Sequence, residues 1–158
     1  MTTVYHTSYT EIPQPDVLHS RRFLDFGKGF YVTHLREQAI NYGNRFLKNN
    51  KPAVLNVYHL DFDPSAFRYK RFESYNSEWL DFVTNCRNGN EVENYDIIEG
   101  GIANDKVFTT IDLYFSNLID KTEALNRLRY EKPNWQICLC TQNAIDKCLQ
   151  FIDSEEIV

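Results

Sequence analysis

The stretch whose residue types most favour ligand binding is 25–33, which reads Asp-Phe-Gly-Lys-Gly-Phe-Tyr-Val-Thr. Two glycines around Lys28 let the backbone approach a ligand closely, and the strand that follows presents Tyr31 beside that approach. A dinucleotide-binding fingerprint would need a third glycine near Val32 and a strand before the first glycine. The Asp-Phe-Gly triplet lacks every other kinase motif, and the chain is too short for a kinase. A tight turn into a strand remains the alternative interpretation.

Two further polar residues lie where strands are predicted. His6 follows Tyr5 in a short first strand beside hydroxyl residues, and Gln136 stands where a late apolar strand begins. A histidine in such a strand is equally compatible with a satisfied structural side chain. Gln136 is equally compatible with an edge-strand amide that caps a neighbouring backbone group.

Together, the order and spacing of these elements resemble the ADP-ribosyltransferase superfamily of the His-Tyr-Glu type, which includes diphtheria toxin and the poly(ADP-ribose) polymerases. Tyr5 and His6 match the first motif, although Thr7 stands where glycine is usual. Residues 26–32 closely match the second motif of the polymerases, Phe-Gly-Lys-Gly-Ile-Tyr-Phe.

The helix and the third motif of that superfamily also have counterparts. Residues 40–42, Ile-Asn-Tyr, stand at the offset from Tyr31 where the family has Ala-Asn-Tyr, and Gln136 replaces the family's Glu in the third motif. A closer likeness, carried by residues 25–31, 95–98 and 130–134, is to a small bacterial family of uncharacterised domains grouped with these transferases. Some members of that family are encoded beside short partner proteins, as in toxin–antitoxin pairs.

The resemblance implies NAD as co-substrate and no metal. It implies that His6 hydrogen-bonds a ribose hydroxyl, that the backbone of Thr7 pairs with the carboxamide, and that Tyr31 and Tyr42 hold the nicotinamide ring between them. Cleavage of the nicotinamide–ribose bond develops positive charge on the sugar, so such a site must hold the ring and orient the ribose for a weak nucleophile. Tyr42 also lies on the apolar side of its predicted helix, which leaves a role in core packing open.

Gln136 limits the chemistry, because an amide can hydrogen-bond but cannot act as a carboxylate base. Within the resemblance it implies mono-transfer, weak NAD hydrolysis or an inactive NAD-binding domain, rather than chain elongation. Gly29 is assigned to NAD through its backbone. The basic residues Arg21, Arg22 and Lys28 can contact the pyrophosphate through charge-assisted hydrogen bonds, or they are ordinary solvated charges.

The leading hypothesis is therefore an intracellular mono-ADP-ribosyltransferase, with the toxin of a bacterial pair as its biological role. Its acceptor is a protein or a nucleic acid, and its partner is a small antitoxin protein. Gln136 and Thr7 favour a second hypothesis, a non-catalytic module that binds a nucleotide or a partner through the same cleft. A third, transfer of a phosphate from RNA onto NAD, requires a His-Arg set that the sequence does not place.

Alternating and helical hydrophobic patterns predict the elements that position these residues. Helices are expected from Leu35 to about Asn49, around 79–86, and over 106–116 and 121–130, with a last short helix and strand ending by Ile152. The strands are expected over 2–9, 30–33, 53–62, 95–98 and 135–141. This order predicts one α+β domain over residues 1–158, and the resemblance implies a split β core flanked by helices.

Composition narrows the class of protein further. The chain has 158 residues, of which 42% are hydrophobic and 15% aromatic, enough for a real core. Its apolar runs are too short to cross a bilayer and no signal peptide is visible, so we expect a cytoplasmic location and no membrane contact. A net charge of -5 disfavours non-specific nucleic-acid binding. The four cysteines lack zinc-site spacing and are expected to be core thiols.

Overall fold

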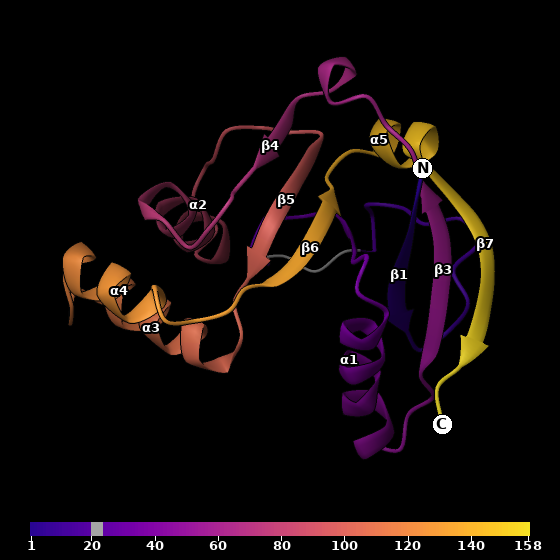
Figure 1. Cartoon of the computed structure of the whole chain (residues 1–158), viewed down its shortest axis with the longest axis horizontal. Coiled ribbons are helices and arrows are strands. Elements are labelled where there is room, and N and C mark those ends of the chain that lie inside the picture. The colour runs from indigo at the N-terminus through magenta and orange to yellow at the C-terminus, as the bar shows by residue number, and fades with distance from the viewer. Residues whose placement is uncertain (20–23) are drawn as a thin grey trace.

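Seven strands form two β-sheets in the computed structural model, which describes residues 1–19 and 24–158 (Figure 1). The strands are β1 (Thr2–Ser8), β2 (Phe30–Val32), β3 (Val54–Leu60), β4 (Tyr69–Arg71), β5 (Ile97–Ile102), β6 (Asn134–Leu139) and β7 (Leu149–Glu156). The first sheet has the order β1-β3-β7 and the second has the order β2-β6-β5-β4. Neighbouring strands are antiparallel except β4 and β5, which are parallel.

One backbone bridge joins the two sheets, between β1 and the end of β2. The N–H of Tyr5 donates to the carbonyl of Thr33 over 2.8 Å, and the N–H of Thr33 donates back to Tyr5 over 3.0 Å. No other backbone pair joins β1 to β2 within residues 1–19 and 24–158. We call this boundary between β1 and β2 the seam. The α+β class is confirmed, and its β core is divided between two sheets.

Most of the α-helices begin at a residue whose side chain caps the first amides. They are α1 (Arg36–Lys48), α2 (Ser77–Arg87), α3 (Asp105–Phe115), α4 (Lys121–Leu128) and α5 (Gln142–Cys148), with a short 3-10 helix at Pro64–Ala66. Four helices have an N-cap side chain that accepts from a first-turn amide, a common way to satisfy those donors: Asn76, Asn104, Asp120 and Thr141. Helix α1 follows Leu35, whose side chain makes no such bond.

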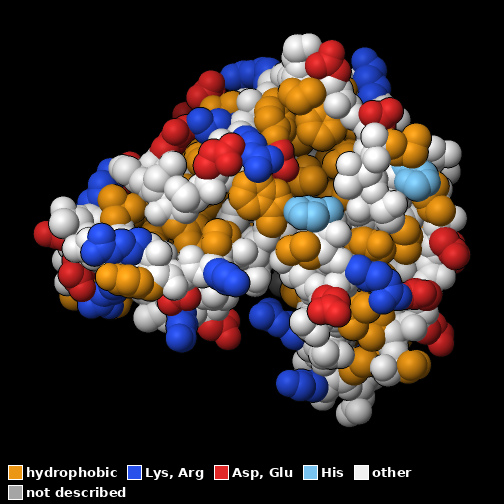
Figure 2. All heavy atoms as spheres, in the orientation of Figure 1, with side chains coloured by type: hydrophobic (Ala, Val, Ile, Leu, Met, Phe, Trp, Pro, Cys, Tyr) orange, Lys and Arg blue, Asp and Glu red, His pale blue; other side chains and the backbone are white. Residues whose placement is uncertain are grey.

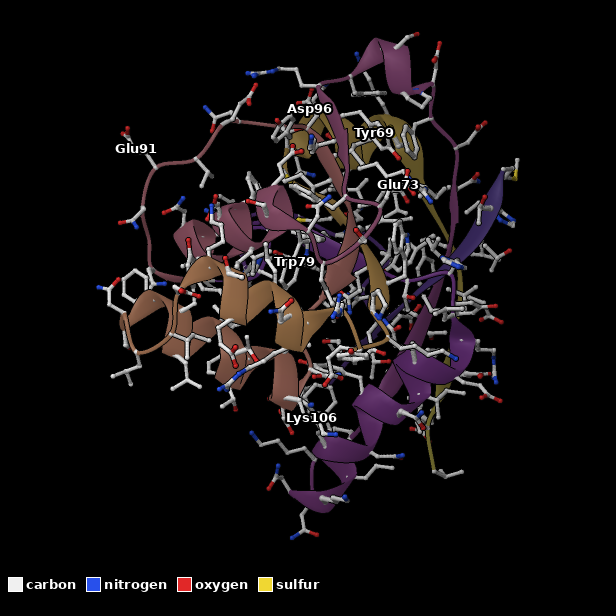
Figure 3. All side chains as sticks on the ribbon, turned by 60° about the vertical axis from the view of Figure 1, so that its left-hand side comes forward. Tyr69, Glu73, Trp79, Glu91, Asp96 and Lys106 are labelled. Carbon is white, nitrogen blue, oxygen red and sulfur yellow. The ribbon has the colours of Figure 1, made fainter. Side chains whose placement is uncertain are left out.

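The helices divide between the two sheets. The helices α2, α3 and α4 pack on one face of the second sheet, where Trp79, which is fully buried, lies between helices and strands (Figure 3). Its indole N–H donates to the carbonyl of Gly101 over 2.8 Å. Helix α1 packs against β1 and β3 through Ala39 and Gly43, and α5 lies against the core between the sheets.

Three strand boundaries differ from the sequence prediction. The strand β5 runs through Gly100 and Gly101 instead of ending before them, because aromatic side chains pack directly on this backbone. A Cβ at Gly100 would lie 3.0 Å from Phe72, and one at Gly101 would lie 2.8 Å from the ring of Tyr75. Strand β4 was not predicted, and β7 extends to Glu156 rather than ending by Ile152.

The cysteines are free, and the structure places three of the four in the core. Cys86, Cys138 and Cys148 are buried, while Cys140 is half-buried with its Sγ 3.5 Å from that of Cys138. Burial raises the pKa of the Cys86 thiol to about 12. The expected core position is confirmed for Cys86, Cys138 and Cys148, whereas Cys140 is only half-buried. Within the described part of the chain, no helix combines the length and the hydropathy needed to cross a membrane.

Candidate functional site

The glycine-containing loop before β2 is held by a buried carboxylate. Asp25 is 7% exposed, forms an ion pair with Arg87 of α2, and accepts a hydrogen bond from the N–H of Ala103 over 2.7 Å. Phe26 beside it lies in the core of the second sheet. The DFG-like triplet therefore anchors the loop to two other elements. The turn is completed by Gly27, whose φ of 80° is one that glycine adopts without strain.

The side chain of Tyr31 is hydrogen-bonded to the backbone of this loop. Its hydroxyl accepts from the N–H of Phe26 over 3.0 Å and donates to the carbonyl of Gly27 over 2.6 Å. Burial raises the pKa of Tyr31 well above its usual value, so the hydroxyl stays protonated and can donate. Tyr31 thus has a structural role that the sequence analysis did not predict, in addition to any contact with a ligand.

The two residues that follow Gly27 differ in their surroundings, since Lys28 is exposed and Gly29 is buried. Lys28 is exposed, as a side chain available to an anion should be. Gly29 is buried against β6, where a Cβ would lie 2.8 Å from the carbonyl of Leu139 and would also collide with the sulfur of Cys138. Close packing therefore accounts for the absence of a side chain at Gly29. Arg21 and Arg22, the other predicted pyrophosphate contacts, lie outside the described residues.

His6 and Tyr31 come together at the seam. The Nδ1 of His6 lies 2.6 Å from the backbone carbonyl of Tyr31, and its ring stacks on Phe30 with centroids 4.2 Å apart. A carbonyl oxygen only accepts hydrogen bonds, so Nδ1 carries the proton. Burial lowers the pKa of His6, an effect that the bond to Tyr31 partly offsets, and the ring is neutral near pH 7. Its Nε2 therefore has a lone pair that can accept a hydrogen bond.

The peptide groups of Thr7 point away from β3, toward the side of β2. Along an antiparallel strand, the N–H and C=O of alternate residues point to the same neighbour. Tyr5 directs both groups to Thr33, so Thr7 directs both of its groups to that side, where β2 has diverged. No hydrogen bond to either group is found on that side within the described residues. The hydroxyl of Thr7 is already used, since it donates to the carbonyl of Ala39 in α1 over 2.6 Å.

Gln136 lies on the same face of the second sheet as Tyr31. Tyr31 pairs with Cys138, and residues two apart on a strand point to one face, so Gln136 points to the side of Tyr31. Gln136 is half-buried, and its amide has no hydrogen bond to another described residue. The structure thus leaves this amide available to a ligand on the predicted face.

Tyr42 is placed less favourably for holding a ring against Tyr31. Its side chain is 38% exposed on α1, beside Phe46 at 5.5 Å between ring centroids and beneath Arg45 at 5.4 Å. The core role that the sequence left open does not apply, because this ring lies at the surface.

Figure 2 shows a notch between α1 and the helices α3 and α4, with Lys and Arg side chains on both of its sides.

A second polar cluster, which the sequence analysis missed, lies on the opposite face of β5 and β6. Glu99 is 9% exposed and accepts hydrogen bonds from Arg71 over 3.1 Å, from Trp135 over 3.2 Å and from the hydroxyl of Tyr69. The sequence does contain a signal for it. Glu99 directly follows the predicted strand 95–98, and an acidic residue buried there needs partners, because burying an unpaired charge is costly.

The described residues contain no group of three or more His, Cys, Asp or Glu side chains arranged to hold a metal ion. Neither the curated proteins nor the solved structures contain a match to this sequence. Residues 2–151 match the model of a family described as "Protein of unknown function (DUF3990)", and because this match covers most of the chain, the protein belongs to that family.

Proposed function

We propose that this protein cleaves NAD and transfers a single ADP-ribose unit to a protein or nucleic-acid acceptor. The observation that carries the proposal lies at the seam, where the peptide groups of Thr7, to which no hydrogen bond from another described residue is found on the side of β2, lie beside the neutral imidazole of His6. These are the two groups to which the resemblance assigns the carboxamide and the ribose. A role as the toxin of a toxin–antitoxin pair, restrained by a small partner protein, belongs to the same proposal.

The chemistry of the seam matches that of a nicotinamide riboside. A carboxamide has one donor group and one acceptor group, and the N–H and C=O of Thr7 complement both. The Nε2 of His6 accepts from a sugar hydroxyl, because its other nitrogen is bound to the carbonyl of Tyr31. Lys28 and the basic side chains around the notch in Figure 2 offer charge-assisted hydrogen bonds to the diphosphate.

In the proposed reaction, the bond between the ribose C1′ and the nicotinamide nitrogen breaks, and its electron pair neutralises the pyridinium. The acceptor forms a new bond to C1′ and loses a proton to solvent. The amide of Gln136 orients the ribose but cannot offset the developing positive charge as a carboxylate would. Slow transfer of one unit follows from this, and chain elongation does not.

A non-catalytic NAD-binding domain is the second candidate, and one observation favours it. Asp25 is the acidic residue whose charge contributes to the raised pKa of Tyr31. Its carboxylate is already bound to Arg87 and to the N–H of Ala103. Asp25 is therefore not free to take the role of the glutamate that Gln136 replaces. Such a domain would bind NAD without releasing nicotinamide.

Substitution of Gln136 separates the two candidates. We expect Gln136→Ala to lower nicotinamide release by roughly tenfold to a thousandfold with little change in NAD affinity, because the amide acts mainly in the transition state. Gln136→Glu should keep or raise release. The matched control is Gln150→Ala, an exposed glutamine on β7. Release is measured chromatographically, affinity by calorimetry, and transfer by labelled NAD in a bacterial lysate.

The outcomes are distinct. Binding of NAD without release, with or without lysate, would support the non-catalytic domain. Failure to bind NAD would contradict both candidates. Turnover that neither Gln136 variant changes would show that the third motif has been placed on the wrong strand.

A further inference from the structure

A cavity of about 580 Å3 opens on the face of the second sheet opposite Tyr31 and Gln136. Its walls include the polar side chains His34, Asp61, Arg71 and Glu99 and the aromatic side chains Phe62 and Trp135. Figure 2 views this face, where hydrophobic side chains lie in a central hollow between a cluster of charged side chains and a histidine. The volume is that of an ordinary small-molecule site, which is commonly about 300–1,000 Å3.

Strand register separates this cavity from the seam. Glu99 pairs with Ile137, which also pairs with Val32, so Glu99 and Val32 share a face, and Tyr31 points to the other. Trp135 lies two residues before Ile137 and therefore also points into the cavity. A ligand here does not occupy the proposed NAD site, and the inference is independent of the proposed function.

The positive charge within the cavity is already neutralised. The Nε of Arg71 binds Glu73 over 2.8 Å, its Nη1 binds Glu99 over 3.1 Å, and its guanidinium lies over the indole of Trp135, 4.6 Å from the ring centroid. Figure 3 labels Tyr69, the first residue of β4, and Glu73, which lies two residues beyond the end of that strand. Because two carboxylates bind this one guanidinium, Arg71 attracts a further anion only weakly.

The negative charge is in excess. The wall contributes the carboxylates of Asp61 and Glu99, and Glu73 lies beside Arg71 outside it, so three carboxylates stand against the guanidinium of Arg71 and the amino group of Met1. His34, which is exposed, is the remaining titratable group of the wall. Burial raises the pKa of Glu99, and the hydrogen bond from Trp135 and the charge of His34 oppose that rise. A buried carboxylate with a raised pKa gains from a further positive neighbour.

We propose that this cavity binds a small organic cation, an amine or guanidinium compound with a flat apolar body. The cationic end lies between Asp61 and Glu99. The apolar body packs on Phe62 and the accessible surface of Trp135, since aromatic side chains and carboxylates together favour such cations. Anionic ligands would meet the same carboxylates and are excluded.

The test uses three probes with one apolar body and different charges: tryptamine, the neutral tryptophol and the anionic indole-3-propionate. Calorimetry on the full chain should show binding of tryptamine, at least tenfold weaker binding of tryptophol, and none of indole-3-propionate. Equal or tighter binding of the anion would overturn the proposal, as would failure of tryptamine to bind at millimolar concentration.

Two variants locate the binding. Asp61→Asn, at an exposed position, and Glu99→Gln should each weaken tryptamine binding by tenfold or more, whereas the control Glu78→Gln, a carboxylate paired with Lys70 elsewhere on the surface, should not. If Glu99→Gln fails to fold, Asp61→Asn decides alone. Affinity unchanged by Asp61→Asn would overturn the assignment to this cavity.

Discussion

The hydroxyl of Tyr31 joins two parts of the loop that carries the Gly-Lys-Gly sequence. Because it accepts from Phe26 and donates to Gly27, its removal leaves one backbone donor and one acceptor without their partner. The tyrosine in this motif therefore stabilises the loop whether or not a ligand is bound. An alanine substitution would remove the ring and this tether together, and would not report on stacking alone.

Tyr31→Phe isolates the tether. We expect the free energy of unfolding to fall by about 1–3 kcal/mol, the range for leaving buried polar groups unsatisfied. Urea unfolding followed by circular dichroism gives the measurement. Tyr130→Phe is the control, because Tyr130 is 80% exposed and should change stability by less than about 0.5 kcal/mol. Equal stability of Tyr31→Phe and wild type would show that the tether contributes nothing.

At the scale of elements, the two glycines around Lys28 are required for different reasons. Gly27 has a positive φ but open space at its Cβ position, with Cys86 Sγ at 3.9 Å as the neighbour. Gly29 lies against the backbone of β6, which cannot move aside like the end of a flexible side chain. The first glycine shapes the turn, and the second lets β2 reach β6.

This difference predicts unequal costs for the two alanine substitutions. Gly27→Ala should destabilise the fold by about 1–2 kcal/mol, the cost of a left-handed backbone for a residue with a Cβ. Gly29→Ala should cost about 3 kcal/mol or more, because overpacking against backbone forces the strands apart. Thermal unfolding of both variants provides the comparison. A larger loss for Gly27→Ala would refute the packing argument.

Local patterns predicted the elements whose hydrophobic period is strong. Helices α1, α2 and α4 and strands β1, β3 and β6 were found close to their predicted bounds. The short β4 has no alternating pattern of its own and exists because β5 offers it a parallel edge. Gly100 and Gly101 predict the end of a strand, and the strand continues because aromatic side chains from distant segments cover them.

The candidate site was predictable to a similar extent. Motif spacing identified His6, Tyr31 and Gln136, and the structure brings His6 to the backbone of Tyr31 and Gln136 to its face. The bond of Asp25 to Arg87 joins residues far apart in the chain, which no local pattern encodes. The cavity around Glu99 likewise collects side chains from both sheets, so only the folded chain shows it.

For the whole molecule, the buried imidazole at the seam links stability to pH. Folding lowers the pKa of His6 below its ordinary value of 6.5, so the unfolded chain takes up the proton first on acidification. The contribution of neutral His6 is present above pH 6.5 and is lost as the pH falls through the lowered pKa.

His6→Gln should therefore flatten the pH dependence of the unfolding free energy between about pH 5 and 7.5, the interval in which histidine titrates. Urea unfolding across this interval tests the expectation, with Gln150→Ala, at an exposed position without a titratable side chain, as a control that keeps the wild-type slope. Identical slopes for wild type and His6→Gln would mean that His6 titrates alike in both states.

The order β1-β3-β7 has a consequence for how the chain acquires its structure. The central strand of the first sheet pairs with the beginning of the chain on one side and with Leu149–Glu156 on the other. During synthesis, at about 5–20 residues per second, β3 emerges long before β7 does. One edge of β3 therefore stays open, as a template for wrong pairing, until β7 has been synthesised and has paired with it. A chain that stops before Leu149 leaves that edge exposed.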